Sequence, residues 1–242
     1  MLGLPEKIAL AKKIKIVVCI DEFQQIAELT HPVTFQKKLR SIWQLQKEVS
    51  YCLFGSKKHL MGELFAKPSL PFYRFGDVIF LQKIDTSHWI KYIQSRFSIT
   101  KKTIPSEMVE RICLTVDNHS SYVQQLAWLI WIRTEEEATE KDFEEAMNDL
   151  INQNSILYYN YLENLTALQI NFLHAIVDGI HNEFSKKEVL TKYNLGASSN
   201  ISRIRKSLEQ KELIDIYPQK IMINDPVFQL WFKRNDFKIL IT

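Results

Sequence analysis

The chain has 242 residues, of which 46% are hydrophobic, and its 31 basic and 28 acidic residues give a formal net charge of +3. So small a charge does not identify a nucleic-acid-binding protein, and no apolar run reaches the ~20 residues that a membrane-spanning helix needs. The six glycines are well below the usual share of about 7%, so we expect a globular, helix-rich, cytoplasmic protein.

The first region alternates β-type runs with helical stretches, which is typical of an α/β fold. The runs are Lys15–Asp21, Tyr51–Gly55 and Asp77–Ile84. Two adjacent carboxylates, Asp21 and Glu22, stand where the first run ends, and ligands of α/β sheets bind at that end of a strand. The alternative is that these acids only favour the start of the following helix.

Three cysteines, Cys19, Cys52 and Cys113, lie in apolar segments and show no paired spacing. This pattern favours buried, reduced thiols over a metal site or a disulfide.

The second region, residues 86–162, is predicted to be helical because its apolar residues recur at helical spacing. Thr139 and Asp142 have the spacing of a capping box, which opens a helix. Tyr158, Tyr159 and Tyr161 are interpreted as packing residues of this region.

The third region contains three helical segments, at about 166–180, 185–193 and 198–211, followed by a short β-type tail near Ile214–Ile223. This order is typical of a winged helix-turn-helix. We therefore expect three domains with boundaries 1–85, 86–162 and 163–242.

Helix 198–211 places apolar residues on one face and Ser199, Arg203 and Lys206 on the opposite face. These three residue types contact phosphates and base edges, so they are candidates for DNA contact. Arg205 lies near the apolar stripe and is expected to extend its guanidinium to water. The alternative is that this module contacts a protein partner.

Several sequence blocks match one family. They are Cys-Ile-Asp-Glu-Phe-Gln at 19–24, Leu-Phe-Gly-Ser at 53–56 with His-Leu-Met at 59–61, Pro-Phe-Tyr-Arg-Phe-Gly at 71–76, His119–Gln124 and Asn224–Phe228. Through these blocks, residues 14–235 resemble the archaeal-type, AAA+-related P-loop ATPases. The resemblance implies an α/β plus all-α fold class: a truncated P-loop NTPase sheet, a helical lid and a C-terminal winged helix-turn-helix.

The resemblance also implies ATP and Mg²⁺ as cofactors. In it Asp21 holds Mg²⁺ at the nucleotide phosphates, Glu22 polarises the attacking water and Ser56 is a polar sensor. Arg74 corresponds to an arginine that reaches a phosphate in the same or a neighbouring subunit. Ser56 as a turn residue and Arg74 as a surface arginine remain open, as does a solvated basic turn at 57–59.

The sequence contains no Gly-x-x-x-x-Gly-Lys-Ser/Thr phosphate loop. In the family the strand before that loop lies between the sensor strand and the last strand, so we expect exposed edges on 51–55 and 77–84. The chain is therefore expected to be truncated or split. By itself it is expected neither to bind nor to hydrolyse ATP appreciably. It is expected to pair with itself or with a missing N-terminal half. The alternative function is a non-enzymatic winged-helix module, binding DNA or protein, with vestigial ATPase motifs.

Overall fold

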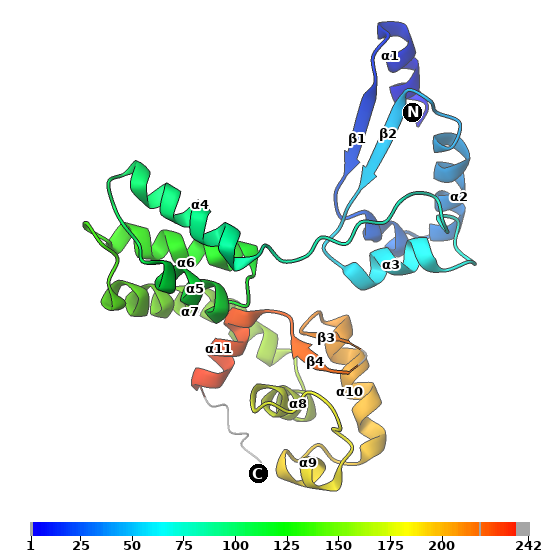
Figure 1. The fold of residues 1–242 in the computed structure, drawn as a ribbon. Coiled ribbons are helices and arrows are strands. Elements are labelled where there is room, and N and C mark those ends of the chain that lie inside the picture. The colour runs from blue at the N-terminus through cyan, green and yellow to red at the C-terminus, as the bar shows by residue number, and fades with distance from the viewer. Residues whose placement is uncertain (1, 218, 236–242) are drawn as a thin grey trace. The chain divides into compact units, whose positions relative to one another are not determined.

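The structure is a computed structural model that describes residues 2–217 and 219–235, without the side chains of residues 58 and 59. The chain forms two compact units, Met1–Leu81 and Gln82–Thr242, and each is described by itself (Figure 1). None of the described helices combines the length and the apolar character needed to cross a membrane.

Unit 1 is built on a two-stranded parallel sheet, β1 (Ile16–Ile20) and β2 (Val49–Leu53), in the register Ile16 opposite Val49. The chain between the two strands contains two helices, because parallel strands need a crossover connection. The helices of the unit are α1 (Leu4–Lys12), the 3₁₀ helix η1 (Phe23–Glu28), α2 (Pro32–Trp43) and α3 (Lys58–Ala66).

One face of the sheet is covered by an aromatic core. Phe23, Trp43 and Phe72 are buried together, and Trp43 stacks on Tyr51 of β2 with ring centroids 4.1 Å apart. Side chains alternate between the two faces of a strand, so the remaining residues of β1 and β2 point to the other face.

That other face is uncovered within unit 1, and it carries two of the cysteines. The prediction of three buried thiols is wrong for Cys19 and Cys52, which are exposed register partners on the two strands. Cys113 in unit 2 is buried, as expected.

The third expected strand, Asp77–Ile84, is not a strand in the structure. Its backbone makes no hydrogen bond to the backbone of any other described residue, and Ile79 is 81% exposed. A strand needs a neighbour for its N–H and C=O groups. The segment has the residue composition of a strand, but the prediction that it forms one is wrong, because it has no neighbouring strand to pair with.

Unit 2 begins with four helices, and their packing confirms the predicted apolar stripes. Trp89, Ile93 and Phe97 are buried on one face of the first helix. The same continuous core extends through the unit to Phe232, near the C-terminus. The helices are α4 (Thr86–Ile99), α5 (Ser106–Thr115), α6 (Ser120–Arg133) and α7 (Glu140–Glu163).

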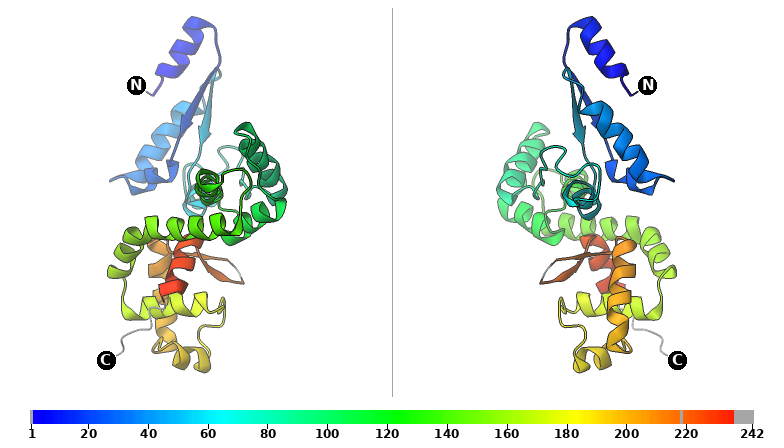
Figure 2. Two further views of the ribbon diagram at one scale, coloured as in Figure 1. Left: turned by 90° about the vertical axis from the view of Figure 1, so that its left-hand side faces the viewer. Right: turned by 90° about the vertical axis from the view of Figure 1, so that its right-hand side faces the viewer.

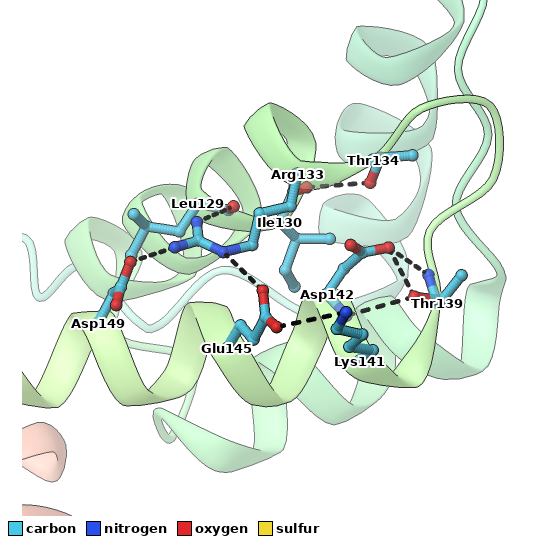
Figure 3. A network of polar contacts seen from close by, with 9 residues as sticks. All are labelled: Leu129, Ile130, Arg133, Thr134, Thr139, Lys141, Asp142, Glu145 and Asp149. Atoms are coloured by element: carbon cyan, nitrogen blue, oxygen red, sulfur yellow. Dashed lines mark hydrogen bonds and ion pairs between the residues drawn. The ribbon is translucent and has the colours of Figure 1, made fainter.

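A polar network at the turn between α6 and α7 holds these two helices together (Figure 3). Arg133 at the end of α6 donates to the backbone oxygen of Leu129 at 2.8 Å and forms ion pairs with Glu145 and Asp149 of α7. Thr139 and Asp142 form the predicted capping box at the start of α7. Figure 3 shows the capping box and the Arg133 ion pairs along the first turns of one helix.

The C-terminal part of unit 2 has the predicted order of three helices and a β-ribbon, followed by a last helix. Ile201, Ile204 and Leu208 form the buried face of the third helix, as expected. The ribbon is antiparallel, with Ile214 opposite Ile223, and it projects from this part of the unit in both views of Figure 2. The elements are α8 (Ala167–Val177), α9 (Lys187–Lys192), α10 (Ser198–Gln210), β3 (Ile214–Ile216), β4 (Ile221–Ile223) and α11 (Pro226–Asn235).

Asp225 joins the four-helix part of unit 2 to this C-terminal part. One carboxylate oxygen accepts the backbone N–H groups of Val227 and Phe228, at 2.8 and 2.9 Å, and so caps α11. The other accepts the hydroxyls of Tyr122 in α6 and Tyr158 in α7, at 2.7 and 3.1 Å. Two blocks of the family resemblance, 119–124 and 224–228, thus meet at one side chain.

Tyr122 and Tyr158 are hydrogen-bond donors to Asp225 because both remain protonated. Burial raises the pKa of each phenol above its ordinary value, and the negative charge of Asp225 raises both further. Tyr158 also packs against the rings of Phe228 and Trp231 in α11. The predicted packing role of Tyr158 is therefore confirmed, and its partners lie in the last helix.

Replacing Asp225 with Ala is expected to lower the free energy of unfolding of unit 2 by about 2–4 kcal/mol. The change removes a helix cap, worth about 1 kcal/mol, and leaves two largely buried hydroxyls without their acceptor. Urea denaturation followed by circular dichroism measures the loss. Asp215→Ala, at an exposed site on β3, is the control. A loss below about 0.5 kcal/mol for Asp225→Ala would contradict this role.

Candidate functional site

The candidate site lies where β1 and β2 end side by side. Two backbone hydrogen bonds continue the pairing beyond the strands: Phe54 N–H donates to Ile20 O at 3.1 Å, and Phe23 N–H donates to Phe54 O at 3.0 Å. This pairing brings two predicted site residues together, and the Ser56 hydroxyl donates to Glu22 Oε2 at 3.2 Å. Glu22 has a positive φ of 49°, in the left-handed region that such residues rarely adopt.

Gln24 is a third member of this site, and the sequence analysis gave it no role. It is fully buried, and its amide Nε2 donates to the same Glu22 oxygen that accepts from Ser56. Its Oε1 has no hydrogen-bond partner among the described residues. The signal in the sequence was a polar residue between two apolar ones, Phe23 and Ile26, at the start of a buried helix.

Gly55 provides the space that Gln24 occupies. A Cβ atom on residue 55 would lie only 1.9 Å from Gln24 Oε1, far inside van der Waals contact. A side chain on residue 55 would therefore displace the Gln24 amide from its observed position.

The site stabilises a charged Glu22. Hydrogen bonds from Gln24 and then Ser56 lower the pKa of this carboxyl, and the positive charge of Lys57 lowers it further. Glu22 is therefore a carboxylate at neutral pH with one oxygen held by two donors.

Asp21 is exposed beside Glu22, and its Oδ1 accepts the backbone N–H of Glu22 at 2.8 Å. In the part of the chain that the structure describes, no group of three His, Cys, Asp or Glu residues is placed to hold a metal ion. Mg²⁺ bound to nucleotides commonly takes only one or two protein carboxylates, with phosphates and waters as the other ligands. Asp21 fits such a site, whereas the sequence offers no phosphate loop.

Arg74 is not brought to Glu22 or Ser56 by any contact within unit 1. Its guanidinium lies 5.2 Å from the centre of the Tyr73 ring, and its φ is 51°. Lys57 contributes charge to the site, and the side chains of residues 58 and 59 lie outside the described part.

The face of α10 predicted for DNA contact is exposed. Ser199, Arg203 and Lys206 all lie on it. A cavity of 750 Å³ opens between α10, the β3–β4 ribbon and residues 181–186, and its lining includes Arg205, Lys220 and the ion pair of Lys186 with Glu183. Arg205, expected to extend to water, is half-buried at this cavity.

Gly55→Ala is expected to raise the pKa of Glu22 towards the ordinary value of about 4.3. The new methyl group displaces Gln24 and removes the hydrogen bond that lowers this pKa most. Carboxyl-detected NMR titration measures it. Gly62→Ala is the matched control, because nothing lies within 4 Å of its added Cβ. An unchanged Glu22 pKa in Gly55→Ala would show that Gln24 does not hold this carboxylate.

Comparisons with known proteins agree with this architecture. Residues 156–234 match a family model described as a probable winged helix domain. No curated protein sequence matches the chain significantly.

Among solved structures, a Walker-type ATPase of Pyrococcus abyssi superposes with a TM-score of 0.72 at 15% identity, over 95% of this chain and 66% of that chain. The RuvB Holliday junction branch migration motor of Thermotoga maritima reaches a TM-score of 0.48 at 12% identity, over 98% of this chain and 75% of that one. The chain thus spans slightly less than two thirds of the Pyrococcus protein. The chain therefore shares the fold of the Walker-type ATPase of Pyrococcus abyssi over most of its length, and it contains a C-terminal winged helix domain.

Proposed function

We propose that this chain is the C-terminal part of an AAA+-like ATPase that binds and hydrolyses ATP only when a Walker A segment completes its sheet. The observation that carries this proposal is the Ser56–Glu22 hydrogen bond at the adjacent ends of two parallel strands. A carboxylate and a polar donor at this position are the groups that orient water for phosphoryl transfer.

The unpaired edges of the sheet support the proposal that ATP binding and hydrolysis depend on a further segment. The apolar residues Val78–Leu81 are exposed and unpaired, and neither outer edge of the β1–β2 pair has a strand beside it in the described part of unit 1. Exposed strand edges and apolar runs favour pairing with added strands. In the completed site Asp21 would hold Mg²⁺ and Glu22 would polarise water, while Arg74 would reach a phosphate in the same or a neighbouring subunit.

The folded 242-residue chain is expected to bind a fluorescent ATP analogue, in the presence of Mg²⁺, with a Kd above about 1 mM, because it lacks the loop that cradles phosphates.

In a longer polypeptide that supplies a Walker A segment, Glu22→Gln should retain nucleotide binding and lose turnover. Glu28→Gln, in the 3₁₀ helix that follows Glu22, is the control. Tight binding by the 242 residues alone, or full turnover by Glu22→Gln, would refute the proposal.

A second candidate function is a non-enzymatic winged-helix module with vestigial ATPase motifs. The exposed Ser199, Arg203 and Lys206, together with Arg205 and Lys220 at the cavity beside α10, favour DNA as its partner over a protein. The cavity supplies further positive charge where the ribbon and α10 meet, as phosphate contact requires.

For this alternative, Arg203→Ala with Lys206→Ala should weaken DNA binding and reduce the slope of log affinity against log salt by about 2, the loss of two phosphate contacts. Fluorescence anisotropy across a salt series measures both. Lys37→Ala with Lys38→Ala removes equal charge from exposed positions in α2 and is the control. An unchanged slope would leave a protein partner as the interpretation of this face.

A further inference from the structure

Helices α4 and α6 of unit 2, both labelled in Figure 1, enclose a hollow of 330 Å³ that no part of the proposed function uses. Tyr92 and Arg96 of α4 form one wall, Trp128 and Trp131 of α6 form the other, and buried Phe97 lies beneath them. Trp128 is 55% exposed. Aromatic walls with few polar groups are typical of binding sites, and the volume is near the lower end of their range.

The described side chains that line the hollow include one cation, Arg96. Residues 86–106 and 118–134, which include both helices, contain no Asp or Glu, whereas Glu135, Glu136 and Glu137 follow directly and Glu137 pairs with Thr103. None of the described side chains that line the hollow is acidic. The surface is therefore complementary to a negatively charged partner.

Arg96 is the cation placed to meet such a partner. Its guanidinium lies 5.0 Å from the centre of the Tyr92 ring, and it has no hydrogen bond or ion pair with any other described residue. The Thr100 hydroxyl, by contrast, already makes hydrogen bonds as an acceptor and as a donor. It accepts from Trp131 Nε1 at 2.9 Å and donates to Phe97 O at 3.0 Å. Arg96 thus brings a charged donor to the rim that has no hydrogen-bond acceptor among the described residues, and a guanidinium binds carboxylates through two parallel hydrogen bonds.

We propose that the hollow binds an acidic protein segment, which inserts one large apolar side chain between Tyr92 and Trp128 and places a carboxylate on Arg96. A buried aromatic anchor beside a charged pair is the arrangement that dominates protein interfaces. Single-stranded nucleic acid would instead need a groove with cations along several phosphates. The hollow is a single apolar depression with one free guanidinium at its rim, which favours the peptide.

The test uses the 242-residue chain without nucleotide, so its result is independent of the proposed ATPase function. The probe is a fluorescein-labelled Asp-Glu-Trp-Leu-Asp-Glu peptide, and its anisotropy reports binding. One comparison peptide has Ser in place of Trp and Leu, and another has Lys in place of each acid. We expect binding of the first peptide only; no binding of that peptide, or equal binding of all three, overturns the proposal.

Single-residue variants test which side chains contact the acidic peptide. Trp128→Ala and Arg96→Glu should each weaken binding of the acidic peptide about tenfold or more. Tyr217→Ala and Lys211→Glu, an exposed aromatic and an exposed cation elsewhere in unit 2, should leave it unchanged. Circular dichroism verifies folding. Unchanged affinity in the first pair overturns the proposal, and so does tighter binding of labelled oligothymidine that the same two variants abolish.

Discussion

Unit 1 depends on the requirement that a β-strand find a neighbour for its backbone hydrogen bonds. β1 and β2 meet this requirement with each other, and their parallel pairing continues for a few residues past both strand ends. That continuation carries Glu22 and Ser56 to one place. The same requirement leaves Val78–Leu81 as exposed chain, although its composition suits a strand well.

The site at the strand ends is organised around one carboxylate. Ser56 and Gln24 both donate to Glu22, and the Gln24 amide occupies the space that a Cβ atom on residue 55 would need. Donors fixed in advance hold a catalytic carboxylate in one orientation and keep it charged. In the proposed function this carboxylate would orient the attacking water, whereas the phosphate-binding half of such a site is not among these residues.

Unit 2 has a different organisation, with a polar connection in its interior and candidate binding surfaces outside. Asp225 joins α6, α7 and α11 through two tyrosine hydroxyls and a helix cap. The cationic face of α10 and the aromatic hollow between α4 and α6 lie on separate elements. They would therefore be available to different partners.

The sequence alone determined the elements whose signals are local. Helical stripes, the Thr139 capping box, the order of the winged helix and the carboxylates after β1 all follow from short-range spacing, and the structure contains each of them. Tertiary structure decided what depends on distant neighbours: the unpaired state of 77–84, the exposure of Cys19 and Cys52, and the burial of Gln24 against Gly55. The spacing of apolar residues indicates which segments suit a strand or a core. Strand pairing and burial depend in addition on residues that are distant in the sequence.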